Sequence, residues 1–250
     1  MQFGAKEVWL TGQDMACYGR DIGLNLVKLL QEVCSIKGDF FVRVGMMTPN
    51  CVLDIFDGLV DTFRNEHVFK FLHLPLQSGD NQVLRRMNRF YLVNDFKRII
   101  EAIRKAIPDI TISTDVICGF PTESEEAFER TLELIEQVKP DIVNISKFFS
   151  RPNTLAEKMA SIVSPSDIAA RSKRLAELAR QISSEKNKVW MNWTGKILVD
   201  ERGKQSDSWI GRNFAYKPIV IKSKDETLFG KFLNVRVAKT FQTYLEAVII

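Results

Sequence analysis

Two hydrogen-bonding side chains, Gln77 and Ser78, directly follow a short apolar segment at 69–76. Gly79 gives the following turn conformational freedom, and Asp80 is a residue type that caps the start of a helix. A polar turn between a buried strand and a helix is a common place for an α/β enzyme to bind a ligand. We therefore predict that Gln77 and Ser78 lie at a ligand-binding edge.

Four polar residues interrupt segments that otherwise have the composition of apolar strands: Arg43, His73, Asp115 and Asn144. A polar side chain inside a buried strand costs free energy unless it meets a partner or a wet cavity. Four of them on successive strands favour a shared, unsealed interior, as in a barrel with its site at the carboxyl ends of the strands. Each could instead be a satisfied structural residue, which is the better interpretation for His73 alone, and Arg43 and Asp115 could form a buried ion pair.

The four cysteines, Cys17, Cys34, Cys51 and Cys118, are far apart in the sequence and form neither a CxxC nor a CxxxCxxC pattern. Structural zinc sites and self-contained iron–sulfur sites use closely spaced cysteines. We therefore predict no metal site on this chain. Each cysteine is expected to be a small buried or loop residue in a reducing compartment.

Short apolar segments alternate with segments of helical period between residues 7 and 149. Thr122 and Glu125 form a T-x-x-E pattern, which predicts a capping box at the start of the last of these helices. Strands that are joined by helices pair in parallel with right-handed crossovers, so we expect a doubly wound sheet or a barrel, and the polar strand residues favour the barrel. The predicted strands are 7–12, 40–46, 69–76, 110–119 and 142–149.

The segment 194–250 changes to five short stretches of strand-like period, which is the size of a small OB-like barrel. It holds 10 Lys and Arg against 6 Asp and Glu, a difference of 4, so it accounts for the whole net charge of +4. A basic module suggests a polyanionic partner such as nucleic acid, although a solvated basic face explains the charge alone equally well.

Aromatic and cationic side chains are interleaved in this module, a pattern suited to base stacking and phosphate contact. Small β-barrels also fill their interiors with aromatic rings, so about half of the aromatic residues are expected in the core. We predict that the following residues are exposed and contact RNA: Trp209, Arg212, Tyr216, Lys217, Lys231 and Phe232, with Phe214 among the exposed aromatics.

The chain is predicted to divide into a barrel at 1–160, a connecting helix at 161–193 and the small barrel at 194–250. No apolar run approaches the roughly 18 residues that a membrane span needs, and the sequence begins with no signal-peptide pattern. We therefore expect a cytoplasmic protein without a membrane partner.

Several motifs resemble those of the radical SAM methylthiotransferases, and they extend over nearly the whole chain: LTGQD with a following YG, RVGMMTP, HLPLQSGDNQVLRRMNRFY, TDVICGFPTESEEAF and FFSRPNT. WIGRNFAYKPIVI and GKFLNVRV resemble the TRAM domain of that family, an OB-like RNA-binding module. The spellings LTGQD and DVICGFPTESEE are most similar to the archaeal and eukaryotic branch. Its members add a methylthio group to C2 of N6-threonylcarbamoyladenosine at tRNA position 37; the isopentenyladenosine and ribosomal-protein branches are alternatives.

The resemblance implies S-adenosylmethionine and [4Fe–4S] clusters as cofactors, and tRNA, a sulfur donor and an electron donor as partners. Family members carry three cysteines in an N-terminal domain and a CxxxCxxC motif after the first barrel strand, and this sequence has neither. The expected fold is therefore a partial radical SAM (β/α) barrel lacking its first strand, followed by the OB-like TRAM barrel. RPNTLAEK at 151–158 also departs from the usual RPGTPAA, which leaves that loop unpredicted.

The resemblance places two polar pairs at the tips of the first and third predicted strands, and a fixed cation and anion on neighbouring strands. We expect these side chains to contact S-adenosylmethionine or the target base: Gln13, Asp14, Arg43, Gln77, Ser78 and Asp115. The leading hypothesis is the C-terminal part of a tRNA methylthiotransferase that binds RNA and part of a cofactor but assembles no cluster. The alternatives are a non-catalytic RNA-binding protein that keeps the barrel as a scaffold, and an unrelated barrel enzyme that uses only the Gln77 edge.

Overall fold

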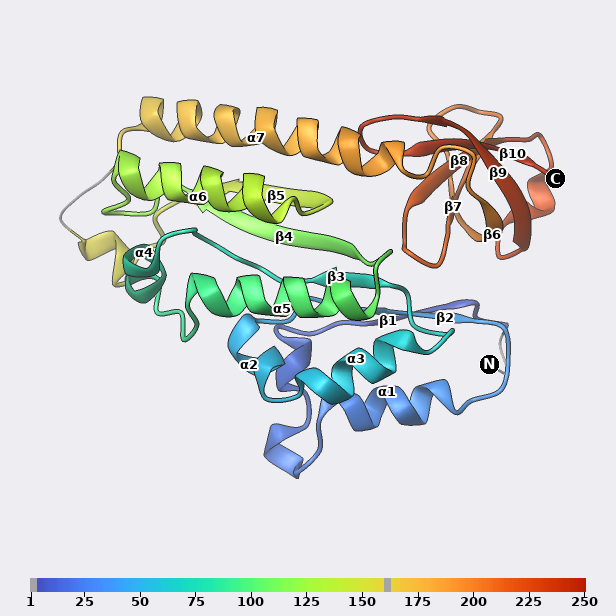
Figure 1. The fold of residues 1–250 in the computed structure, drawn as a ribbon, viewed down its shortest axis with the longest axis horizontal. Coiled ribbons are helices and arrows are strands. Elements are labelled where there is room, and N and C mark those ends of the chain that lie inside the picture. Colours follow the sequence, from blue (N-terminus) through green and yellow to red (C-terminus); the bar gives the residue numbers. More distant parts are fainter. Residues whose placement is uncertain (1–3, 160–162) are drawn as a thin grey trace.

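The computed structural model describes residues 4–159 and 163–250. Its first part is an α/β partial barrel of five parallel strands that follow one another in chain order, as predicted (Figure 1). One group of strands is β1–β2, another is β3–β4–β5, and the groups meet at a bridge between Val42 and Val68. The strands are β1 (Glu7–Leu10), β2 (Phe41–Val44), β3 (Phe71–His73), β4 (Thr111–Cys118) and β5 (Ile142–Lys147).

Helices flank the strands, and the long helix α7 runs along β5 and α6 toward the C-terminal module (Figure 1). The α-helices are α1 (Leu26–Cys34), α2 (Pro49–Leu53), α3 (Phe56–Arg64), α4 (Asn81–Arg86), α5 (Val93–Ala106), α6 (Glu125–Val138) and α7 (Pro165–Lys188). The 3-10 helices are η1 (Met15–Cys17), η2 (Arg20–Ile22), η3 (Ala156–Lys158) and η4 (Glu226–Leu228). Within the described ranges, no helix is both long and apolar enough to cross a membrane.

Helix α5 shows how the sequence period produces the core. Its apolar residues recur at helical spacing, which gathers them on one face, and the resulting stripe is at most 2% exposed: Phe96, Ile99, Ile100 and Ile103.

The start of α6 differs from the prediction. Ser124 caps this helix by accepting from the Ala127 N–H, while Thr122 has a left-handed φ of 74°, so the capping box predicted at Thr122 is wrong. Glu125 instead forms an ion pair with α7.

The C-terminal module is a closed five-stranded barrel in the order β10-β8-β7-β6-β9, which confirms the predicted small barrel. Closure pairs every strand on both sides and leaves no free sheet edge. Its core is a separate apolar cluster that includes Ile197, Val199, Ile219 and Val235. The strands are β6 (Thr194–Arg202), β7 (Ser208–Arg212), β8 (Pro218–Lys222), β9 (Phe232–Thr240) and β10 (Leu245–Ile249).

The small barrel packs against the amino ends of the partial-barrel strands. The Tyr216 ring contacts Phe69 and Phe71, with centroids 4.7 and 5.1 Å apart. Lys217 donates a hydrogen bond to Asp141, which immediately precedes β5. The carboxyl ends of the strands therefore lie at the other end of the partial barrel, away from the small barrel (Figure 1).

Candidate active site

Gln77 lies at the carboxyl end of the sheet, where the chain leaves β3. Its backbone N–H donates to the Asp115 carbonyl at 2.8 Å, and its carbonyl accepts from the Ile117 N–H at 3.0 Å. These bonds hold Gln77 beside β4 with a φ of 69°, a left-handed conformation that is uncommon for a residue with a side chain. Backbone strain of this kind is concentrated at functional sites.

The residues after Gln77 build the turn rather than line a cavity. Ser78 is fully buried, and its Oγ accepts from the Asp80 N–H at 3.2 Å, so this hydroxyl stabilises the turn. Gly79 is required because a Cβ there would lie 2.5 Å from the Thr131 Cα of α6. Asp80 caps α4, as predicted, through the N–H groups of its second and third residues.

A cavity of about 530 Å³ opens at this end of the strands, and both Gln77 and Asp115 line it. Two cations, Lys147 and Arg151, also line the cavity, and Phe148 adds an aromatic ring. Sequence reasoning missed these three, because it placed the polar pairs of the site at the tips of the first and third predicted strands, whereas Lys147 ends β5 and Phe148 and Arg151 follow it. The cavity combines an acceptor, an amide, cations and an aromatic ring, a set suited to a ligand with a carboxylate, hydroxyl groups and a planar ring.

Asp115 on β4 lies between two donors on the neighbouring strands. His73 Nε2 on β3 is 2.9 Å away, and Asn144 Nδ2 on β5 donates at 2.8 Å. Burial raises the pKa of Asp115, but the hydrogen bonds from His73 and Asn144 outweigh it and hold the pKa below its ordinary value. Asp115 is therefore an ionised acceptor fixed by its neighbours, and the ion pair considered between Arg43 and Asp115 is not formed.

Arg43 lies among aromatic rings. Its guanidinium carbon is 5.0 Å from the ring centroids of Trp9 and Phe71 and 5.2 Å from that of Tyr216. Its Nε is buried and has no hydrogen-bond acceptor among the described residues. Arg43 lines a second cavity, of about 510 Å³, between the strands, α7 and the small barrel. His73 and Asn144 line this cavity too, so their bridge to Asp115 lies between the two cavities.

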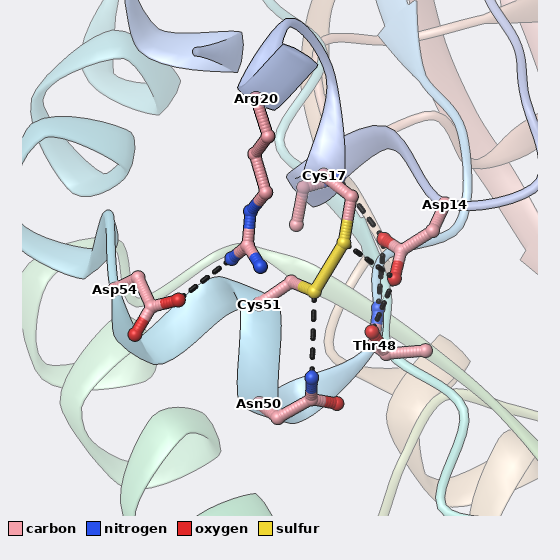
Figure 2. Close-up of a disulfide and its surroundings, with 8 residues drawn as sticks. Asp14, Cys17, Arg20, Thr48, Asn50, Cys51 and Asp54 are labelled. Carbon is pink, nitrogen blue, oxygen red and sulfur yellow. Dashed lines mark hydrogen bonds and ion pairs between the residues drawn. A yellow bond between two sulfur atoms is a disulfide. The ribbon is translucent and has the colours of Figure 1, made fainter. Parts of the chain in front are cut away.

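Asp14 connects the tips of β1 and β2 (Figure 2). Its Oδ1 accepts from the backbone N–H groups of Ala16 and Thr48 at 3.1 and 3.2 Å, and its Oδ2 accepts from the Thr48 hydroxyl. Gln13 is exposed beside it. Neither residue lines the cavity that contains Gln77, so the structure does not bring the two predicted polar pairs into one pocket.

Cys17 of η1 and Cys51 of α2 form a disulfide next to Asp14 (Figure 2). The expectation that each cysteine is a small buried or loop residue in a reducing compartment does not account for this pair, which meets because β1 and β2 pair in parallel and bring the segments that follow them together. Cys118 is buried, and burial raises its pKa to about 12, so its thiol stays protonated. Cys34 lies at the end of α1. The four cysteines therefore do not fit the three-thiolate site of a [4Fe–4S] cluster.

Two of the residues predicted to be exposed for RNA contact are buried. Trp209 is 3% exposed in the core of the small barrel. Lys217 is 5% exposed, and its Nζ donates to Asp141 and Asn187 at 2.8 and 3.2 Å. Tyr216 is half-buried and faces the partial barrel. These three predictions of exposure are wrong for two reasons. Trp209 fills the interior of its own barrel, whereas Tyr216 and Lys217 are covered by segments far away in the sequence.

The other predicted RNA contacts lie at the outer surface of the small barrel. Lys231 is exposed and Phe232 is half-buried, with Lys196 Nζ 4.3 Å from the Phe232 ring centroid. Phe232 and Lys196 line a groove of about 840 Å³ at the junction of the two barrels, which we call the junction groove. Sequence reasoning named Phe214 and Phe232 but missed the residues that distant segments contribute: Lys37, Asp39, Phe40, Phe41, Arg64, Glu66, His67 and Lys70, with Gly38.

Arg212 is engaged in the small barrel by Asp200, whose Oδ2 is 3.2 Å from the Arg212 Nε. Burial raises the pKa of Asp200 to about 6, although Arg212 opposes the shift, and Oδ1 of Asp200 has no hydrogen-bond partner among the described residues. The carboxylate is therefore under-satisfied in its ionised form.

We expect Asp200→Asn to gain stability relative to the unchanged protein as pH rises. The pKa of Asp200 is higher in the folded protein, about 6, than in the unfolded chain, 3.8. The protonated side chain therefore stabilises the folded protein fully below pH 3.8, and this contribution is lost as the pH rises through about 6. The difference in free energy of unfolding should shift by about 1–2 kcal/mol in favour of the variant between pH 4 and pH 7, after allowance for solvent screening. Urea unfolding at several pH values measures it, with the exposed Asp207→Asn as matched control; a flat difference would contradict the prediction.

Comparison with known families assigns both parts of the chain. A family model described as the Radical SAM superfamily matches residues 2–135, and one described as the TRAM domain matches residues 194–250. Among solved structures, coproporphyrinogen III oxidase from Escherichia coli, a radical SAM enzyme, aligns over 86% of this chain and 50% of its own, with a TM-score of 0.50 and 16% identity. At that identity the likeness concerns the fold alone.

Curated relatives match nearly the whole chain. The probable threonylcarbamoyladenosine tRNA methylthiotransferase of Pyrococcus horikoshii is 44% identical over 97% of this chain and 56% of its own length. That of Methanocaldococcus jannaschii is 42% identical over 95% of this chain and 54% of its own. The threonylcarbamoyladenosine tRNA methylthiotransferase of Drosophila melanogaster is 35% identical over 94% of this chain and 42% of its own length. The chain thus spans about half the length of these relatives.

Proposed function

The chain belongs to the radical SAM superfamily and carries a TRAM domain, and from this premise we propose that it acts in tRNA modification. The proposed reaction is methylthiolation of C2 of N6-threonylcarbamoyladenosine at tRNA position 37, in the cytoplasm, with a sulfur donor and an electron donor as further partners. The observation that carries the proposal is a sequence identity of 35–44% to threonylcarbamoyladenosine tRNA methylthiotransferases, along at least 94% of the chain.

The cavity at Gln77 is the proposed place for S-adenosylmethionine, which in this superfamily supplies the radical chemistry that activates an unreactive C–H bond. The ionised Asp115 can accept from an ammonium or a ribose hydroxyl, and the Gln77 amide can pair with the edge of a base. Lys147 and Arg151 can hold a carboxylate at the same cavity. His73 acts as a positioning residue, because it orients Asp115 from the other side. The cysteines of this chain do not fit an iron–sulfur cluster.

The junction groove is the proposed contact for the tRNA strand. Four of its side chains are cations and four are phenylalanines, against two carboxylates, so it can pair with phosphates and stack with bases. Residues of both the partial barrel and the small barrel line the groove, so an RNA bound there would contact both barrels.

We expect Phe232→Ala to weaken tRNA binding by about 5- to 100-fold, the range for loss of one base-stacking ring. Lys196→Ala should weaken binding less and reduce its dependence on salt, because a phosphate contact is lost. Fluorescence anisotropy with an anticodon stem-loop at two salt concentrations measures both effects. The matched control is Phe229→Ala, since Phe229 is exposed on the same barrel but does not line the groove. Equal affinities for the Phe232 and Phe229 variants would reject the groove.

The modification itself is tested in cells. Mass spectrometry of tRNA nucleosides from cells lacking the gene should show loss of 2-methylthio-N6-threonylcarbamoyladenosine and accumulation of the nucleoside without the methylthio group. Unchanged nucleosides, together with tRNA binding by the purified chain, would favour a second function: a non-catalytic RNA-binding protein. The specific observation in favour of that alternative is that the cysteines do not fit a cluster site. Anaerobic reconstitution with iron and sulfide should therefore yield no stoichiometric cluster on this chain.

A further inference from the structure

Three metal-ligand side chains meet at the tips of β1 and β2: Asp14, Cys17 and Cys51 (Figure 2). One ligand atom from each lies within 4.8 Å of the others. Asp14 and Cys17 come from the turn after β1, whereas Cys51 comes from α2 after β2, so the cluster joins two segments 34 residues apart. It lies outside the cavity that contains Gln77.

We propose that reduction of the Cys17–Cys51 disulfide opens a site for a thiophilic divalent cation such as Zn²⁺, bound by the two thiolates and the Asp14 carboxylate. Two sulfur ligands and one oxygen ligand suit zinc better than magnesium or calcium, which prefer all-oxygen sites. The fourth position is left to water. This proposal does not rest on the proposed function.

The geometry around Asp14 supports the proposal. Cys17 Sγ is 3.4 Å from Asp14 Oδ2, and tetrahedral zinc with ordinary bond lengths places a sulfur and an oxygen ligand about 3.5 Å apart. Only the two sulfurs need to move, from bonding distance to roughly 3.7 Å. Cys17 is the last residue of η1 and is half-buried, so a rotation of its side chain can supply this separation of the two sulfurs.

Neighbouring residues hold the ligand side chains in place through hydrogen bonds. Oδ1 of Asp14 accepts from two backbone N–H groups, of Ala16 and Thr48, and Oδ2, which faces Cys17 Sγ, also accepts from the Thr48 hydroxyl. Asn50 Nδ2 lies 3.4 Å from Cys51 Sγ and can donate to a thiolate there. Hydrogen bonds to the ligand side chains orient these ligands and raise their affinity for the metal.

The chemical steps balance with an external dithiol as the reductant. The dithiol attacks the half-buried Cys17 sulfur, the Cys17–Cys51 bond breaks, and the dithiol closes to its own disulfide, leaving two protonated cysteines. Zn²⁺ then binds as both thiols lose their protons to solvent. The disulfide form of the dithiol reverses the sequence: it takes two electrons from the thiolates and returns to the dithiol, the Cys17–Cys51 bond forms again and the ion is released. The site is therefore open only in the reduced chain.

The experiment compares the oxidised and the reduced 250-residue chain, freed of dithiol under anaerobic conditions, by equilibrium dialysis with Zn²⁺ and titration with Co²⁺. We expect about one Zn²⁺ per reduced chain, with a thiolate-to-cobalt charge-transfer band, and at least a tenfold lower affinity after oxidation. This comparison needs no substitution, so it does not depend on how well a variant folds. Equal binding in both states, or no binding by the reduced chain, would overturn the proposal.

Variants then assign the ligands. Cys51→Ser and Cys17→Ser should lose the charge-transfer band, and Asp14→Asn should weaken Zn²⁺ binding at least about tenfold, since even indirect supports of a metal ligand are worth that much. Cys34→Ser is the matched control, because Cys34 is a free cysteine outside the cluster. A Cys34 variant that loses the band while the Cys51 variant keeps it would place the metal elsewhere and reject the site.

Discussion

Replacing Arg171 with methionine is expected to lower the free energy of unfolding by about 3–5 kcal/mol, the range for breaking a buried ion pair from one side. Arg171 on α7 donates to the Glu123 carboxylate at 2.9 Å and also to the Glu123 carbonyl at 2.9 Å. The Glu123 side chain is 1% exposed, so the variant would leave a buried carboxylate whose one remaining donor among residues 4–159 and 163–250 is the Gly119 N–H. Burial already raises the pKa of Glu123, although Gly119 and Arg171 oppose the shift.

Chemical denaturation monitored by circular dichroism measures this loss, and Arg174→Met on the same helix is the matched control. Arg174 also pairs with carboxylates, those of Glu125 and Glu129, but its side chain is 44% exposed and the pairs are solvated. Its replacement should cost at most about 1 kcal/mol. Adding Glu123→Gln to the Arg171 variant should recover part of the loss, because the unpaired charge is removed. Equal losses at 171 and 174 would show that burial of the pair is unimportant.

Replacing Lys217 with methionine is expected to cost about 3 kcal/mol and to loosen the packing of the small barrel on the partial barrel. Lys217 and Asp141 form a pair across this interface, with side chains 6% and 8% exposed. Without Lys217, Asp141 keeps the Ile112 N–H at 3.0 Å and the more distant Arg104 at 4.0 Å, so the loss falls at the lower end of the range for buried pairs. Fluorescence of two tryptophans reports the transition: Trp190 in the core of the small barrel and Trp193, which packs against that core.

The control for Lys217 is Lys224→Met, which removes the same charge from a side chain that is 86% exposed on the same module. Its effect should stay within about 0.5 kcal/mol. The double variant Lys217→Met with Asp141→Asn should lose less than the sum of the single variants, because the two residues interact directly. Additive losses would mean that Lys217 stabilises the protein through packing of its stem alone. Limited proteolysis near 189–193 then reports whether the two barrels separate.

Local pattern was sufficient for the order of the elements. The stripe Phe96, Ile99, Ile100 and Ile103 fixed a helix, and Asp80 capped the helix after β3 as its residue type predicts. These outcomes depend on residues within one or two turns of each other, where spacing and capping chemistry act directly. The alternation of strands and helices, and the change of period at residue 194, therefore predicted parallel strands in a doubly wound sheet or a barrel, followed by a small barrel. That the first barrel is partial was implied only by the family resemblance.

Tertiary structure alone decided which polar side chains serve a site and which stabilise the fold. Lys217 has the sequence setting of an RNA contact, but its charge is neutralised by Asp141, 76 residues away. Asp115 is paired with His73 rather than Arg43, and Cys17 meets Cys51 because two strand tips coincide. The physical reason is that burial and pairing depend on which distant segments share a surface, and the period of a sequence carries no information on that.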